Sequence, residues 1–206
     1  MRMRFLASAC LVCAACLPID VARAGDLRFR LHLSYVNGIY DLVDQYEDNI
    51  EEEGSGGWIE TDVDTFVWPV GIAASGYYQW DNGLTLGAGL GPFMYIIAES
   101  WADDDYVHWQ LPVNVTVGYV LAPNDPVSVY VRAGPSYHIA DGDYYDGSNV
   151  GIFGAVGVEF LKRDRIMFGV EAAYDTAEVD IENVRTGGTE GIKAGEFSLG
   201  VFIAFK

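Results

Sequence analysis

The stretch VHWQLPVNVTVGYV, from Val107 to Val120, separates into two unlike sets of side chains when every second residue is taken. One set is apolar and contains Val107, Trp109, Leu111, Val113, Val115, Val117 and Tyr119; the other is small or polar and contains His108, Gln110, Pro112, Asn114, Thr116 and Gly118. A period of two over this length is typical of a β-strand whose two faces meet different surroundings. The stretch therefore predicts one strand of a two-faced sheet.

Seven further segments of the chain alternate in the same way. Together with the opening stretch they predict eight strands, at Leu27–Val43, Thr65–Trp80, Leu84–Ala98, Tyr106–Leu121, Val127–Ala140, Val150–Leu161, Ile166–Val179 and Ala194–Lys206. Tight turns at Trp80–Gly83, Ala122–Pro126 and Lys162–Arg165 alternate along the chain with longer polar connections. No stretch of helical period is expected to interrupt the strands. This order predicts an all-β fold, an eight-stranded antiparallel up-and-down barrel.

The composition of the two faces indicates which one points outward. The apolar face carries no charge, whereas the other mixes Gly, Ala and Ser with a few charges of both signs. Small residues suit the narrow lumen of an eight-stranded barrel, and glycine is a poor choice for water-exposed strand interiors. We therefore expect the apolar face to meet lipid in a transmembrane barrel. The alternative is a soluble, lipocalin-like periplasmic binder with the apolar face inside.

The first 24 residues, MRMRFLASACLVCAACLPIDVARA, differ from the rest of the chain. Arginines precede a short apolar run, and Ala22-Arg23-Ala24 forms a small-residue cleavage site. Residues 1–24 are therefore predicted to be a secretory signal peptide cleaved after Ala24, which leaves residues 25–206 as a single barrel domain. A lipoprotein signal at Cys16 is the alternative. All three cysteines of the chain lie in this segment, so the barrel domain has none.

The charge of the chain restricts its partners. The formal net charge is −18, which argues against nucleic acid. After residue 24 no apolar run is long enough for a transmembrane helix, which needs about 18 residues or more.

Four Gly-aromatic phrases carry a family resemblance: GAGLGPFMY (Gly87–Tyr95), YVRAGPSYHI (Tyr130–Ile139), GAVGVEF (Gly154–Phe160) and the closing EFSLGVFIAFK. With the signal peptide, they make the chain similar to the small eight-stranded outer-membrane β-barrel proteins of Gram-negative bacteria, the OmpA-like and OmpX-like class. The resemblance implies a monomer in the outer membrane, in contact with lipid and lipopolysaccharide. It also implies recognition by the barrel-assembly machinery through a terminal aromatic residue. Here Phe205 is penultimate and Lys206 is last, so that assembly signal departs from the pattern.

Charged residues on the inward face are candidates for ion pairs across the lumen. These candidates are Arg28, Arg30, Arg132 and Lys206 on one side, and Glu159, Glu171, Asp175 and Glu196 on the other. Buried charges of both signs need partners, or each costs several kcal/mol. We expect the pairs to plug the lumen; a small gated pore for small solutes is the alternative.

Histidines on the inward face have two candidate roles. His108 and His138 are expected at similar heights near the loop end, with Asp103, Asp104, Asp105, Asp141 and Asp143 close in sequence, so these residues are a weak candidate metal site. His32 and Ser34 form an H-x-S pair on the same face. That pair keeps open a lipid A-modifying barrel enzyme, although Ser-His chemistry also needs a third, orienting group. We expect no catalysis and no cofactor.

An acidic segment follows the first predicted strand. Between Asp41 and Asp64 there are ten acids and no Lys, Arg or His. The candidate loop residues are Glu47, Asp48, Glu51, Glu52, Glu53, Glu60, Asp62 and Asp64. Beside anionic lipopolysaccharide, such a loop predicts weak Ca²⁺ or Mg²⁺ association, attraction of a basic partner, or simple solvation. The sequence thus favours a structural or surface-interacting barrel protein.

Overall fold

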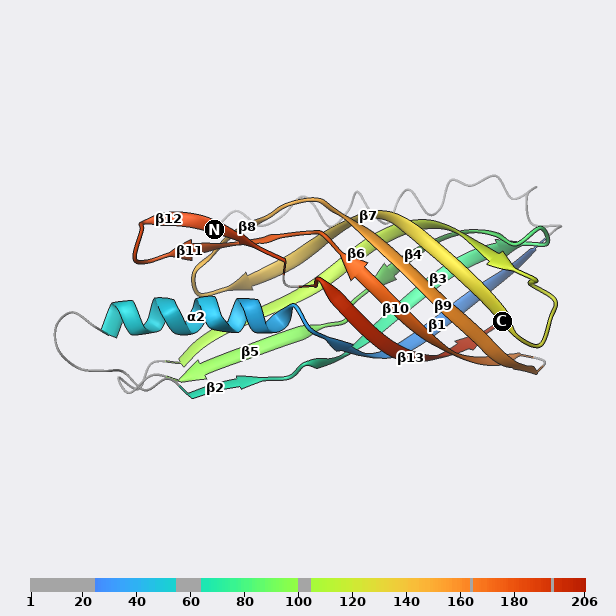
Figure 1. Ribbon diagram of the computed structural model, residues 1–206, viewed down its shortest axis with the longest axis horizontal. Coiled ribbons are helices and arrows are strands. Elements are labelled where there is room, and N and C mark those ends of the chain that lie inside the picture. The colour runs from blue at the N-terminus through green and yellow to red at the C-terminus, as the bar shows by residue number, and fades with distance from the viewer. Residues whose placement is uncertain (1–24, 55–63, 100–104, 164, 194) are drawn as a thin grey trace.

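The computed structural model describes residues 25–54, 64–99, 105–163, 165–193 and 195–206. The predicted signal peptide, residues 1–24, lies outside the described residues. The molecule is an elongated barrel with an extension at one end, and the C-terminus lies at the opposite end (Figure 1). None of the described helices is long and apolar enough to cross a membrane.

Ten strands form one closed antiparallel sheet. They are β1 (Gly25–Val36), β2 (Asp64–Val67), β3 (Val70–Trp80), β4 (Leu84–Leu90), β5 (Met94–Glu99), β6 (Asp105–Leu121), β7 (Ser128–Gly142), β9 (Gly151–Arg163), β10 (Ile166–Asp175) and β13 (Phe197–Phe205). Their order is β2-β5-β6-β4-β3-β1-β13-β10-β9-β7, and pairing of β6 with β7 closes the ring. β2 continues the line of β3, and β5 continues the line of β4, so the barrel has eight strands around its circumference. The predicted eight-stranded antiparallel barrel is confirmed.

The two faces of the barrel are those expected from the alternation. On β1, Leu27, Phe29, Leu31 and Leu33 are each more than half exposed, whereas Arg28, Arg30 and His32 between them are buried. Exposed apolar side chains on all eight barrel strands, such as Ile72 on β3 and Val201 on β13, give the barrel an apolar outer surface. The lumen is lined by polar and small residues.

Two predicted strands are interrupted near the loop end. The expected strand Thr65–Trp80 is divided at Trp68 and Pro69, and the expected strand Leu84–Ala98 is divided at Gly91–Phe93. Proline has no backbone N–H for the ladder, which is why Pro69 and Pro92 fall at the breaks. Above these breaks β2, β5 and the upper part of β6 continue as one wall of the extension (Figure 1).

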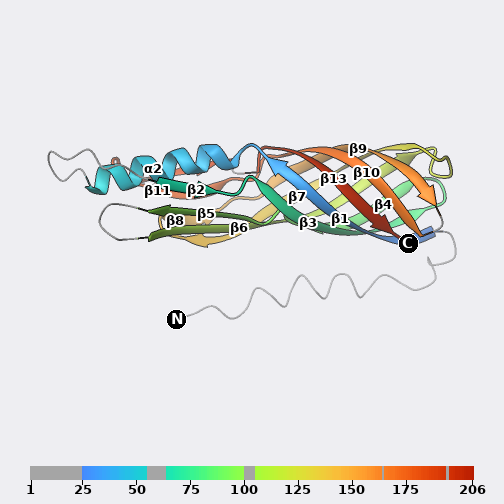
Figure 2. The same ribbon diagram turned by 90° about the horizontal axis from the view of Figure 1, so that it is seen from below.

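The prediction that no helix interrupts the strands is wrong. The first strand ends at Val36 rather than Val43, and helix α2 (Ile39–Gly54) follows it. The buried residues of the helix, Ile39, Leu42, Val43, Tyr46 and Ile50, recur at intervals of one turn, as on an amphipathic helix. Helix α2 lies beyond the barrel alongside β2 and β11 (Figure 2).

The two long connections near the C-terminus also contain structure that the sequence analysis treats as loop. β8 (Tyr145–Ser148), β11 (Val179–Asn183) and β12 (Gly188–Ile192) form a separate three-stranded sheet in the order β12-β11-β8. This small sheet shares one apolar core with the wall formed by β2, β5 and β6, and α2 runs between the two in Figure 1 and along one edge of both in Figure 2. We call α2 and these two walls the cap.

Candidate functional site

A layer of paired charges crosses the lower lumen. Arg30 Nη2 lies 2.6 Å from Glu159 Oε1, and Arg28 Nη1 lies 3.6 Å from the other oxygen of that carboxylate. Arg132 donates two hydrogen bonds to Glu171, of 3.0 and 2.7 Å. Glycines sit opposite both glutamates on the neighbouring strands, Gly169 opposite Glu159 and Gly157 opposite Glu171, and leave room for the rings of Phe202 and Tyr130. We call the five charged residues, Arg28, Arg30, Arg132, Glu159 and Glu171, the ion-pair layer.

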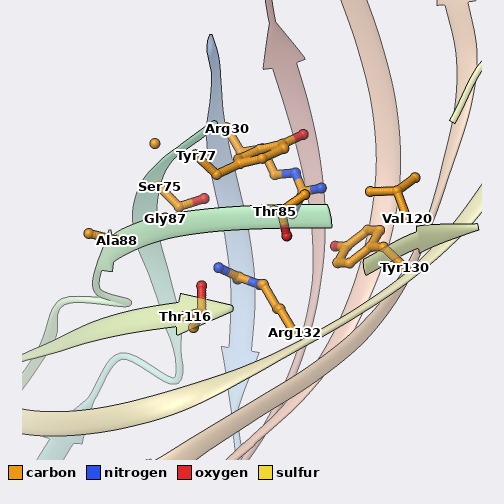
Figure 3. Close-up of a pocket in the computed structure, with 11 residues that line it drawn as sticks. Arg30, Ser75, Tyr77, Thr85, Gly87, Ala88, Thr116, Val120, Tyr130 and Arg132 are labelled. Carbon is orange, nitrogen blue, oxygen red and sulfur yellow. The ribbon is translucent and has the colours of Figure 1, made fainter. Parts of the chain in front are cut away.

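Aromatic side chains enclose the central cation of this layer. The guanidinium carbon of Arg30 lies 4.2 Å from the ring centre of Tyr77, 4.1 Å from that of Tyr130 and 4.8 Å from that of Phe202. The two phenols also donate hydrogen bonds, Tyr77 to Glu159 and Tyr130 to Glu171. Figure 3 shows Arg30, Tyr77, Tyr130 and Arg132 around the same cavity. Cation–π contacts and charged hydrogen bonds together hold Arg30 in a dehydrated position.

Three small cavities lie along the described lumen. Their volumes are about 10, 30 and 20 Å³ from the ion-pair layer toward the cap, and neighbouring cavities share lining residues such as Arg132 and Phe153. Each holds about one or two water molecules at most. Asn114 Oδ1, which borders the largest, is a buried acceptor without a hydrogen-bond partner among the described residues.

The predicted H-x-S pair is not a unit in the structure. The imidazole of His32 contacts Ser75 Oγ at 3.3 Å, while its other nitrogen lies 3.8 Å from Glu171 Oε1. Glu171 is already bound by Arg132 and Tyr130, and the adjoining cavity of about 30 Å³ is far smaller than an acyl substrate. His32 thus completes the packing above the ion-pair layer.

The cap is built on an apolar core at the loop end of the barrel. The inner face of α2 packs against Met94 and Ile96 of β5 and against Val179 and Ile181 of β11. Five buried residues of α2 contribute roughly 8–15 kcal/mol of gross burial at about 1.5–3 kcal/mol each. Like-charged neighbours on the outer face of the helix oppose this by only about 0.2–0.5 kcal/mol per pair. Packing therefore determines the position of this highly acidic helix.

Polar contacts pin the helix at two further points. Asn49 is buried; its amide donates to the Glu182 carbonyl oxygen at 2.5 Å, and its Oδ1 accepts from the Val184 N–H at 3.1 Å. At the end of the helix, Glu53 accepts hydrogen bonds from the phenols of Tyr106 and Tyr144. These contacts tie α2 to both walls of the cap.

Tyr46 joins the cap to the upper lumen. Its hydroxyl contacts His108 Nδ1 at 3.1 Å and donates to the Asp143 carbonyl oxygen. Burial raises the pKa of the Tyr46 phenol, and the negative charges of Asp143 and Asp141 raise it further. The phenol is therefore neutral at physiological pH.

The described members of the candidate metal site do not form a cluster of three or more ligating side chains. His108 and His138 are buried beneath the cap, where His138 lies 3.5 Å from Asp175 Oδ2. The carboxylates of Asp141 and Asp143 instead accept backbone N–H groups, from Gly142 and Val107. Asp103 and Asp104 lie outside the described residues, and Asp105 begins β6. Among the described residues no three His, Cys, Asp or Glu side chains converge as a metal site requires.

Other predicted site residues lie outside the ion-pair layer. Lys206 pairs with Asp26 at 2.6 Å at the tight-turn end, Glu196 accepts from the Tyr174 hydroxyl, and Asp175 accepts from Ser136. Phe205 pairs in register with Phe29 and Ile166. Of the acidic segment, Glu47, Asp48, Glu51, Glu52 and Glu53 lie on α2 away from its buried face, Asp64 begins β2, and Glu60 and Asp62 lie outside the described residues.

A closed antiparallel barrel that is apolar outside and polar inside is the architecture of outer-membrane barrel proteins. The chain belongs to the family described as "outer membrane protein beta-barrel domain", whose model matches residues 7–205. The apolar outer surface is therefore its membrane-facing surface, and the outer membrane is its location.

Solved structures share the fold. OprG from Pseudomonas aeruginosa is 11% identical, with a TM-score of 0.52 over 88% of this chain and 95% of that one. Outer membrane protein W from E. coli is 15% identical, with a TM-score of 0.51 over 89% and 98% of the two chains. A search of curated protein sequences finds no match to the chain. At these identities the likeness shows the fold alone.

Proposed function

We propose that the protein is a closed outer-membrane barrel with a structural or surface-interacting role, which displays the cap on the outside of the cell. One observation carries the proposal: the apolar core beneath α2 occupies the loop end of the barrel, above a lumen already crossed by the ion-pair layer. Long connections of outer-membrane barrels face the cell exterior, which orients the cap outward.

Planar-bilayer recording tests the closed state. The purified protein, shown to be folded by faster migration of the unboiled band in SDS, is expected to add no stepwise conductance. Discrete steps from folded wild-type protein would contradict a plugged lumen and favour the second candidate, a small gated pore. The row of cavities between the ion-pair layer and the cap is the feature that favours that candidate.

The outer face of α2 suggests the chemistry of a surface partner. Asp41, Asp44, Asp48, Glu51 and Glu52 are exposed there, and Arg185, 3.6 Å from Glu52, is the cation paired with this face among the described residues. A cationic partner or a divalent ion would relieve the repulsion between these carboxylates.

Thermal melting in detergent tests the divalent-ion part of this proposal. Addition of about 1 mM Ca²⁺, a concentration at which extracellular calcium sites fill, is expected to raise the melting temperature. The matched control replaces Asp44, Asp48 and Glu51 with their amides, which keeps side-chain volume and removes charge. An equal shift in both proteins, or none in the wild type, would remove divalent ions from the account and leave the basic partner.

A further inference from the structure

The wall of the cap formed by β2, β5 and the upper part of β6 is apolar on its outward face, and on β5 the inward face is apolar as well. On β5, Met94, Ile96 and Ala98 are buried, while the alternate residues Tyr95 and Ile97 are only partly buried. Phe93, just before β5, is 47% exposed; Phe66 on the adjoining β2 and Trp68, just after it, are 56% and 58% exposed. Antiparallel strands that face water on one side normally alternate apolar with polar residues. This wall therefore has the pattern of a sheet that is covered on both sides.

The opposite wall of the same cap has the water-facing pattern. On β11, Val179 and Ile181 are buried in the core that also holds Ile96, but the alternate residues are Asp180 and Glu182. The outer face of α2 is acidic as well. The two sides of the cap thus share one core and differ only in what they present outward, which makes the apolar side specific to β2, β5 and β6.

The apolar wall is continuous with the membrane-facing surface of the barrel. Phe66, Ile97 and Val107 stand side by side in the register of the three strands, as the highest apolar row. Below them Phe93 stacks on Trp109 with ring centres 6.3 Å apart, and the surface continues into Ile72 on β3 and Leu90 on β4. One row above, the register positions are Asp64, Glu99 and Asp105. The apolar surface therefore runs without a break from the barrel to the row of Phe66, Ile97 and Val107.

The lengths of the apolar runs differ around the molecule. On β6 the run extends from Val107 to Leu121, or about 46 Å of strand at ~3.3 Å per residue, whereas on β10 it extends from Ile166 to Tyr174, or about 26 Å. At a strand tilt of ~45° these lengths correspond to heights of about 33 and 19 Å. The apolar band of outer-membrane barrels is about 25 Å tall. The β6 side exceeds that band and the β10 side falls short of it.

We propose that the outward face of β2, β5 and upper β6 is a lipid-contact surface, covered by acyl chains of the outer leaflet, so that the membrane boundary stands higher on this side of the cap than on the β11 side. The occupant is hydrocarbon because the face continues the established lipid-facing surface and carries no charge below its acidic edge.

Quenching of single tryptophans by brominated lipid tests the proposal. The native tryptophans Trp58, Trp68, Trp80, Trp101 and Trp109 are replaced with Phe, and one tryptophan is introduced at a time. Phe66→Trp probes the upper apolar row, Ile72→Trp is the reference within the barrel band, and Glu182→Trp is the matched control on the opposite wall. Each protein is reconstituted in phosphatidylcholine vesicles with or without bromine midway along the acyl chains. Migration of the unboiled band in SDS reports folding.

The Phe66→Trp and Ile72→Trp proteins are expected to be quenched to a similar degree, with a ratio close to one, while the Glu182→Trp protein is left unquenched. Equal behaviour of the Phe66→Trp and Glu182→Trp proteins, with both open to aqueous acrylamide, would overturn the proposal. Shielding of the Phe66→Trp protein from both quenchers, with a dimer mass in sedimentation, would overturn it in favour of a second copy of the chain. If Phe66→Trp does not fold, the protein that retains native Trp68 alone gives the same comparison.

Discussion

Replacing Glu171 with Gln should weaken the barrel more than any change of similar size on its surface. The substitution keeps the shape of the side chain but removes its charge. Glu171 accepts two hydrogen bonds from Arg132, at 3.0 and 2.7 Å, and a third from Tyr130 at 2.7 Å. An amide offers one acceptor oxygen, so part of this set is lost. Arg132 would remain buried without its counter-ion.

The expected magnitude follows from the charges of the layer. Three arginines face two glutamates in the layer, and the variant leaves Glu159 as its one carboxylate, although Arg28 also lies 3.7 Å from Asp26. Breaking a buried pair by removal of one partner costs about 3–5 kcal/mol. With a urea dependence of roughly 1–3 kcal/mol per molar, the unfolding midpoint should fall by about 1–5 M, or about 2 M at the centre of both ranges.

Urea unfolding in detergent, followed by band mobility and tryptophan fluorescence, measures this change. Glu196→Gln is the control, because that carboxylate accepts one hydrogen bond from Tyr174 at the surface, and it should change stability by less than about 1 kcal/mol. The double variant Glu171→Gln with Arg132→Met should lose less than the sum of the single changes, since the stranded charge is gone. A Glu171→Gln midpoint equal to that of the control, or strict additivity in the double variant, would refute the argument.

Three further predictions concern the cap. Leu42→Ala removes a fully buried side chain from α2 and should speed hydrogen exchange of the helix by the equivalent of about 2–5 kcal/mol while the β10 amides keep their protection; exposed Asp44→Ala should leave both unchanged. Asn49→Ala removes the side-chain partner of the Val184 N–H and of the Glu182 carbonyl, and should lower the opening free energy of the same helix by about 1–3 kcal/mol in the same assay. Protection equal to that of the wild type would show that water replaces the amide. Because the folded state raises the pKa of Tyr46, the stability that its neutral phenol contributes is present below pH ~10 and is lost at higher pH, where the phenol of the unfolded chain ionises. The melting temperature should therefore fall less steeply between about pH 9 and 12 in the Tyr46→Phe variant than in the wild type. Parallel curves for the two proteins would contradict this.

The barrel could be predicted because the alternation of apolar and polar residues is repeated along every barrel strand. Alternation on β1, for example, places Leu31 outside and His32 inside without any knowledge of the other strands. The helix was missed although its signal is present: Ile39, Leu42, Val43, Tyr46 and Ile50 have helical spacing. The acids between them, together with the absence of a basic residue in the last turn, resemble a solvated loop. Helix propensity and charge oppose each other here, and only packing against Ile96 and Ile181 decides the outcome.

Residue types in the lumen could be predicted, but their partners could not. Parity places Arg30 and Glu159 on the inward face, yet they lie on β1 and β9, which are separated in the sheet by β13 and β10. Whether they meet across the lumen depends on the stagger of the strands, which alternation does not determine. The aromatic enclosure of Arg30 by Tyr77, Tyr130 and Phe202 depends on the same stagger, and for that reason it was not found from the sequence.

The ion-pair layer and the core beneath α2 differ in chemistry, and if the barrel is closed as proposed, this difference bears on how it could open. The ion-pair layer is fixed by charge: moving Arg30 away from Glu159 leaves both groups in a low-dielectric environment, and the cost rises as water is excluded. The core beneath α2 is fixed by apolar burial, so it releases when its residues can reach water and is not weakened by the screening of charges. Loss of the cap alone would still leave Arg30, Arg132 and their partners across the lumen. Loss of one ion pair would still leave the apolar core above it. A single substitution in either should therefore lower stability without producing conductance, and a conducting state would require changes in both Glu171 and Leu42.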